Sequence, residues 1–137
     1  MKISKQFPKY AFLGVIVAGL GFALFAFLNT KKQHVVVDVR VPELSAAAVN
    51  GKVAFDANCA QCHGKNAAGT GKGPPLVHIL YTPGHHGDRA FFVAVKRGAR
   101  RHHWPYGDMK PLPNVTDAEL TGIVKYVREL QVANGIN

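Results

Sequence analysis

The sequence predicts an all-α protein, in which one N-terminal transmembrane helix precedes a small helical domain. Three observations predict this class. Residues 11–28 form a long apolar run, and three later stretches carry apolar residues at helical spacing. The only two cysteines lie in one motif, Cys59-Ala60-Gln61-Cys62-His63, directly after the first of those stretches. These features divide the chain into a tip and anchor at 1–30, an extended tether at 31–44 and the helical domain at 45–137.

The apolar run at residues 11–28 contains 18 residues without a charge. As a helix it would measure about 27 Å, enough to cross the hydrocarbon core of a bilayer. A cleaved secretory signal is the competing interpretation, because Lys2, Lys5 and Lys9 precede the run. Signal peptides have shorter apolar runs, and the bulky residues at 25–28 block a small-residue cleavage site. We therefore expect an uncleaved single-pass anchor.

The tether at 31–44 has the composition of an extended segment. Residues 35–41 (VVVDVRV) combine strong β-propensity with partial alternation, and Pro42 ends the run. A lone strand has no pairing partner in a helical domain. We expect a spacer that lies on the domain, and the alternative is pairing of its exposed edge with another subunit.

The first two helices of the domain are expected on either side of the cysteine motif. One begins at Ser45 and leads directly into the motif. The other covers residues 88–96, with Asp88 as a candidate N-cap and Gly98 as a candidate C-cap.

The third helix opens at a capping box formed by Thr116 and Glu119 and is expected to end near Asn134. Its apolar residues recur at 3.6-residue spacing. Glycine- and proline-rich connectors at 64–75 and 106–114 separate the helices. They suit loops that wrap around a cofactor better than they suit a sheet.

The pentapeptide at 59–63 is the C-x-x-C-H attachment signature of a c-type haem. Two thiols, Cys59 and Cys62, can add to the two vinyl groups of one porphyrin, which holds His63 under the iron as an axial ligand. A thioredoxin-type site would need a βαβ context, and a zinc site would need a second ligand pair. We expect one covalent haem c, whose apolar volume also supports a domain this small.

With these residues in view, the segment from Ser45 to Gln131 resembles the class I cytochrome c family. Gly51 and Phe55, spaced ahead of Cys59, fit the family's first helix, in which a glycine permits close crossing by the last helix. Tyr126 fits the aromatic residue that packs at this crossing. The resemblance implies a small helical domain around a covalent haem and an electron carrier rather than an enzyme.

The resemblance also implies two further residues of the haem site. Pro74 corresponds to the proline whose carbonyl accepts the Nδ1 hydrogen of the axial histidine. Met109, followed closely by Pro111, corresponds to the sixth iron ligand. Methionine more often fills a core, but this hydrophilic loop offers no core to fill, and a thioether suits low-spin iron. Ligation by His63 and Met109 leaves no position for a substrate, so we expect outer-sphere electron transfer, in which the haem iron cycles between Fe(II) and Fe(III). The resemblance implies that the carrier works in a membrane-bound respiratory chain.

The histidines depart from the family pattern. Five lie between the haem motif and Met109: His78, His85, His86, His102 and His103. The two adjacent pairs could converge on copper or zinc, because imidazole suits both metals. The alternatives are solvated side chains, partners of the haem propionates, or a histidine in place of Met109 on the iron. A copper-handling haem protein is therefore an alternative function, and a haem subunit of a larger oxidoreductase is another.

The chain is strongly basic, with a formal net charge of +9. Lys96, Arg97, Arg100 and Arg101 concentrate positive charge between the second helix and Met109. Such a patch favours docking to an acidic redox partner, with a solvated face or attraction to anionic lipid as alternatives. Binding to nucleic acid is not expected, because no such motif is present.

The resemblance extends to location and partners. In bacterial c-type cytochromes the haem is attached on the outer, periplasmic side of the cytoplasmic membrane, which would leave the N-terminal tip in the cytoplasm. A cytochrome bc-type complex, a terminal oxidase or another reductase are the partner classes that the resemblance implies.

Overall fold

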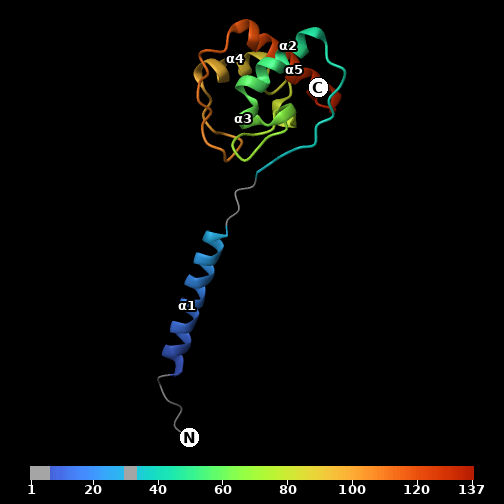
Figure 1. Cartoon of the computed structure of the whole chain (residues 1–137). Helices are drawn as coiled ribbons and strands as arrows, with labels where there is room; N and C mark the ends of the chain where they lie inside the picture. The colour runs from blue at the N-terminus through green and yellow to red at the C-terminus, as the bar shows by residue number, and fades with distance from the viewer. Residues whose placement is uncertain (1–6, 30–33) are drawn as a thin grey trace. The chain divides into compact units, whose positions relative to one another are not determined.

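The computed structural model describes residues 7–29 and 34–137. The chain forms two compact units, Met1–Lys32 and Gln33–Asn137. Regular structure in the described residues is entirely helical (Figure 1), which confirms the predicted all-α class. The tip at 1–6 and the beginning of the tether, including Lys31 and Lys32, lie outside the described residues.

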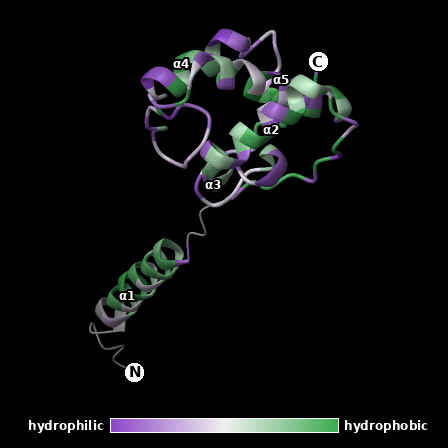
Figure 2. Cartoon of the chain, turned by 45° about the horizontal axis from the view of Figure 1, so that its top comes forward, coloured by the Kyte–Doolittle hydropathy of each residue, from purple (hydrophilic) through white to green (hydrophobic). Residues whose placement is uncertain are grey.

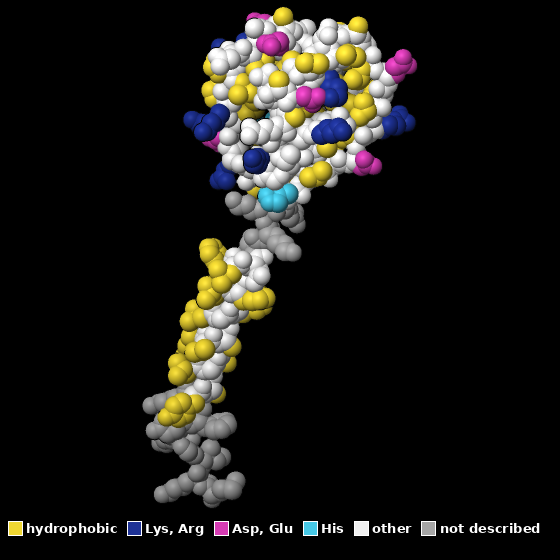
Figure 3. Space-filling model, in the orientation of Figure 1, with side chains coloured by type: hydrophobic (Ala, Val, Ile, Leu, Met, Phe, Trp, Pro, Cys, Tyr) yellow, Lys and Arg dark blue, Asp and Glu magenta, His cyan; other side chains and the backbone are white. Residues whose placement is uncertain are grey.

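Helix α1 (Phe7–Leu28) contains the apolar run that the sequence marked as an anchor. Its Tyr10–Leu28 portion has a mean hydropathy of 2.5, and none of that portion is buried. Most of the helix is coloured as hydrophobic in Figure 2, and hydrophobic side chains project along it in Figure 3. Helix α1 is therefore a candidate membrane span, because 22 residues rise by about 33 Å.

The second unit contains the predicted helices and additional short ones. Its elements are α2 (Ala46–Asn58), α3 (Ala60–His63), the 3₁₀ turns η1 (Lys65–Ala67) and η2 (Ile79–Tyr81), α4 (Asp88–Arg97) and α5 (Asp117–Ala133). The short helix α3 is part of the haem motif, and η1 and η2 lie between the motif and α4.

Helices α2 and α5 cross at a pair of glycines. A Cβ added at Gly51 would lie 1.8 Å from the carbonyl oxygen of Gly122, so the two backbones touch where side chains are missing. Beside this point the rings of Phe55 and Tyr126 meet edge to face, with centroids 5.5 Å apart, and both are fully buried. The close crossing expected at Gly51 is confirmed.

Local capping signals set the helix boundaries. The Ser45 side chain accepts a hydrogen bond from the backbone of α2, and the capping box of Thr116 and Glu119 is complete. Gly98 ends α4 with a φ of 79°, as predicted. The expectation that Asp88 caps α4 is wrong: Gly87 is the N-cap, and Asp88 is the first helical residue.

The extended segment at 34–44 belongs to the second unit and is bonded to its loops and to the end of α5. The Val37 amide donates to the Ala68 carbonyl over 2.9 Å. The Asn134 side chain bonds both backbone groups of Arg40, at 2.9 and 2.8 Å. A loop carbonyl and the Asn134 side chain thus satisfy backbone groups of this segment, in place of a pairing strand.

Candidate functional site

The cysteine motif occupies the junction of α2 and α3. Cys59 ends α2 and begins α3, and its carbonyl accepts the His63 amide over 2.9 Å. Cys59 is buried and Cys62 is exposed. Burial, followed by the nearby Cys62, raises the pKa of the Cys59 thiol to about 11, so the thiol stays protonated near neutral pH. One turn of helix therefore presents both sulfurs and the imidazole together.

The imidazole of His63 is held in one tautomer by Pro74. His63 Nδ1 lies 2.8 Å from the Pro74 carbonyl oxygen. A carbonyl can only accept, so Nδ1 carries the hydrogen and Nε2 keeps its lone pair. Burial lowers the pKa of His63, and the hydrogen bond to Pro74 opposes that shift. His63 thus presents a neutral nitrogen donor of the kind that binds iron.

The loop after α3 brings Pro74 back to His63. Asn66 and Ala67 adopt positive φ angles of 55° and 58°, which reverse the chain sharply. The buried Ala67 then accepts the Leu76 amide over 2.8 Å. A Cβ on Gly73 would lie 2.9 Å from the Cys62 carbonyl oxygen, so glycine permits this close return.

Met109 closes a loop that begins at Ala99. The two residues form an isolated antiparallel bridge, with amide-to-carbonyl distances of 3.0 and 2.8 Å. The Asp108 carboxylate accepts the Arg101 amide over 2.9 Å inside the loop. Met109 is half-buried and packs against the hydrophobic core. Its backbone is therefore fixed on both sides, although its surroundings are more apolar than the sequence suggested.

Four of the five histidines come together. The Nε2 atoms of His85 and His103 are 3.3 Å apart, and those of His86 and His102 are 3.5 Å apart. Desolvation, followed by the charges of the three neighbouring imidazoles, lowers the pKa of His103. His78 does not join them, because its ring lies 4.9 Å from that of Trp104.

Trp104 carries a buried polar atom without a partner. Its Nε1 makes no hydrogen bond in the described part of the chain, although the Tyr81 side chain is close by. A buried N–H in this condition needs an acceptor.

The four basic residues of the predicted patch differ in whether their charge is paired. Lys96 Nζ lies 2.8 Å from Asp117 and donates to the Val115 carbonyl, so its charge is engaged at the start of α5. Arg97, Arg100 and Arg101 are exposed, and no carboxylate in residues 7–29 and 34–137 forms an ion pair with them. The free positive charge therefore lies on these three arginines.

Comparison with known families shows to which family the chain belongs. A family model described as cytochrome c matches residues 48–131, more than half of the chain. The chain belongs to the cytochrome c family. Cytochromes c carry covalently attached haem c and transfer electrons through it, so this protein is a haem-based electron carrier. Searches of curated proteins and of solved structures found no significant match.

The residues of this cytochrome c domain fit a covalent haem. The motif supplies two thiols on one helical turn, and the Pro74 hydrogen bond leaves the Nε2 of His63 available to iron. The unpartnered Trp104 N–H is a buried donor suited to an anionic oxygen such as a haem carboxylate. These observations come from three separate segments of the chain.

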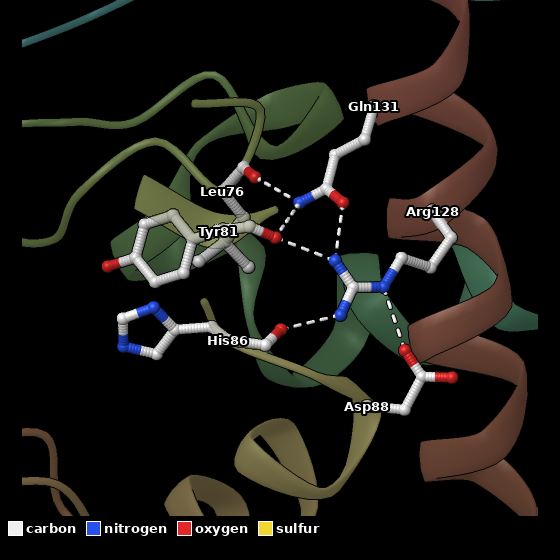
Figure 4. A network of polar contacts seen from close by, with 6 residues as sticks. All are labelled: Leu76, Tyr81, His86, Asp88, Arg128 and Gln131. Atoms are coloured by element: carbon white, nitrogen blue, oxygen red, sulfur yellow. Dashed lines mark hydrogen bonds and ion pairs between the residues drawn. The ribbon is translucent and has the colours of Figure 1, made fainter. Parts of the chain in front are cut away.

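The cytochrome c domain also contains a polar network that the sequence analysis did not identify. Arg128 donates to the Tyr81 and His86 carbonyls, each over 2.6 Å, and pairs with Asp88 over 2.8 Å (Figure 4). Gln131, which is buried, donates to the Leu76 carbonyl over 2.8 Å. The only signal in the sequence was a charged and an amide residue beside the apolar face of α5. Their acceptors are backbone carbonyls, which no side-chain pattern reveals.

Proposed function

We propose that this protein is a membrane-anchored one-electron carrier with thioether bonds at Cys59 and Cys62 and with His63 and Met109 as axial ligands. The observation that carries the proposal is the 2.8 Å hydrogen bond from His63 to Pro74, because it presents one defined nitrogen beside the two thiols. The haem, when bound, supplies the Fe(II)/Fe(III) couple.

The bridge between Ala99 and Met109 supports a role for Met109 as the second ligand. Both backbone hydrogen bonds of the bridge restrain the main chain of Met109, so its side chain starts from a fixed position in the loop. If His63 and Met109 both bind the iron, no coordination position would remain for a substrate. The chain's residues then act by holding the same geometry in both oxidation states, which suits electron transfer.

The location proposed for this carrier is the outer face of the cytoplasmic membrane. Helix α1 supplies a candidate span of sufficient length, and haem attachment in bacterial relatives takes place outside that membrane. The N-terminus would remain in the cytoplasm. A cytochrome bc-type complex and a terminal oxidase are the partner classes that we propose, from the resemblance to class I cytochromes c.

Replacing Met109 with alanine tests the ligand assignment. We expect the Met109→Ala protein to lose the ferric sulfur-to-iron charge-transfer band and to have a lower reduction potential, because a thioether favours ferrous iron. Visible spectroscopy and a redox titration measure both. The neighbouring exposed residue serves as control, and Lys110→Ala should leave the band in place. A Met109→Ala spectrum identical to that of the wild type would mean that another residue, such as a histidine, ligates the iron.

The exposed arginines are proposed to steer anionic redox partners. Reversing Arg100 and Arg101 to glutamate should slow reduction of ferricyanide, a trianionic oxidant, in stopped-flow experiments at low salt. The wild-type rate should fall as the Debye length shortens from about 30 Å at 0.01 M to about 8 Å at 0.15 M ionic strength, and the variant should show a flatter dependence.

A matched charge reversal separates local steering from net charge. Arg40→Glu with Lys72→Glu changes the total charge equally, and both side chains are exposed outside the loop. Equal slowing by the two double variants would refute a specific role for Arg100 and Arg101.

A further inference from the structure

Four histidines meet from two loops that flank α4. His85 and His86 follow a turn in which both amides donate to the Thr82 carbonyl, over 3.0 and 2.8 Å. His102 and His103 lie in the loop between α4 and Met109. Each histidine of that loop faces one from the turn: His103 faces His85, and His102 faces His86. The neighbouring rings within each pair also lie close, with centroids 4.5 and 4.3 Å apart.

Two of these imidazoles are held with their lone pairs directed at each other. His86 Nδ1 lies 2.5 Å from the Leu80 carbonyl oxygen, and His102 Nδ1 lies 2.7 Å from that of Arg100. Each Nδ1 must carry a hydrogen, because a carbonyl only accepts. In the neutral side chains both Nε2 atoms are then acceptors, and they face each other at 3.5 Å. Two lone pairs that face each other repel, and a cation between them would remove this repulsion.

The spacing of the nitrogens suits a single metal ion. Zinc binds imidazole nitrogen at 2.0–2.1 Å, so two nitrogens at a tetrahedral angle lie about 3.3 Å apart. The two facing Nε2 pairs are separated by 3.3 and 3.5 Å. Ligand nitrogens of His85, His86 and His103 all lie within 4.8 Å of one another. A common centre for all four nitrogens would require rotation of the exposed rings of His85, His102 and His103.

The backbone around the cluster is held in place from α5 and from the Met109 bridge. Arg128 donates to the carbonyl of His86 (Figure 4), which fixes the first loop. The bridge between Ala99 and Met109 fixes the base of the second loop. The hydrogen bonds from His86 and His102 to backbone carbonyls orient two of the rings in the manner found for metal-binding histidines. The backbone of both loops and two of the four rings are therefore held in place without a metal.

We propose that His85, His86, His102 and His103 bind one late transition-metal dication, Zn²⁺ or Cu²⁺, at a site separate from the haem. A ligand set made only of imidazole favours these ions over Mg²⁺ or Ca²⁺, which prefer oxygen. His85, His102 and His103 are exposed, so the ion reaches the site directly from solvent. The contacts between the four imidazoles do not involve His63 or Met109, so the proposal does not depend on ligation of the iron by Met109.

The test is a titration of the full-length ferric holoprotein in detergent with CuSO₄, followed by calorimetry and electron paramagnetic resonance. The wild type should bind one Cu²⁺ per chain with hyperfine splitting from several nitrogens. His102→Gln with His103→Gln removes two ligands and should weaken binding by at least about 100-fold, since loss of a supporting contact alone weakens metal binding by 10–100-fold. Zn²⁺ should compete for the same site only when it is in excess, because nitrogen ligands bind Cu²⁺ more tightly than Zn²⁺.

Two controls keep the outcome decisive. His34→Ala removes a histidine outside the cluster and should leave the stoichiometry and the resonance spectrum unchanged. His85→Gln, in the other loop, should weaken binding as well, which would not follow if the double variant merely distorted its own loop. The haem spectrum of each variant reports whether the domain remains folded. A flat titration of the wild type, or Cu²⁺ binding with the same spectrum after loss of His102 and His103, would overturn the proposal.

Discussion

Replacing Gly51 with alanine is expected to lower the free energy of unfolding by about 3 kcal/mol or more. The new Cβ would lie 1.8 Å from the Gly122 carbonyl oxygen and 2.2 Å from its carbon. Both atoms belong to backbone, so relief requires that α2 and α5 move apart. The roughly 1 kcal/mol gain in helix propensity from glycine to alanine does not offset this separation. Chemical denaturation of the holoprotein followed by circular dichroism measures the change.

The facing glycine provides a graded control. A Cβ at Gly122 would lie 3.1 Å from the nearest atom, Gly51 Cα, so a small shift accommodates it. We expect Gly122→Ala to change stability by less than about 1 kcal/mol, because its propensity gain opposes the remaining crowding. Gly84→Ala adds a Cβ with no neighbour within 4 Å and should be nearly neutral. Equal effects at Gly51 and Gly122 would contradict the asymmetric crossing that the structure shows.

Removal of the Arg128 side chain is expected to destabilise the domain by about 3 kcal/mol. Its guanidinium lies over the Phe91 ring at 5.0 Å and bonds the carbonyls of Tyr81 and His86. After Arg128→Ala the Tyr81 carbonyl keeps a 3.2 Å contact with Gln131, whereas the His86 carbonyl loses its hydrogen bond. Hydrogen bonds from a charged donor contribute more than neutral ones, so most of the effect comes from these carbonyls. The midpoint of denaturant unfolding measures it.

A substitution at Asp88 tests the ion pair separately from the other contacts of Arg128. The Asp88 side chain is 65% exposed, whereas that of Arg128 is 15% exposed. Exposed ion pairs contribute little, so Asp88→Asn should lower stability by less than about 1 kcal/mol. A loss as large as that of Arg128→Ala would show that the ion pair with Asp88, rather than the bonds to the backbone, holds α5 to the loop.

The elements with short-range signals were predictable from the sequence. The capping box at Thr116 places its own donors and acceptors within one turn, so α5 begins where the pattern indicated. Gly98 ends α4 because its positive φ suits glycine. Asp88 was misplaced by one residue, because a carboxylate in the first turn of a helix and one at its N-cap give the same local signal.

The candidate sites also differ in whether their residues are close together in the sequence. The haem motif is local, since Cys59, Cys62 and His63 share one turn. The convergence of the two histidine pairs is not local, because neighbouring side chains usually point apart. The turn before α4 and the loop closed by the Met109 bridge had to meet before the Nε2 atoms could approach to 3.3 and 3.5 Å.

The sequence by itself determined that this protein has an apolar N-terminal helix, three main helices in its second unit, and a motif for covalent haem, because each depends on residues within a few turns of one another. Only the tertiary structure decided how the loops are held. Arg128 bonds carbonyls more than forty residues away, and Met109 is restrained through the backbone of Ala99. Backbone carbonyls and amides are present at nearly every residue, so no sequence pattern selects the ones that a distant side chain or strand will meet.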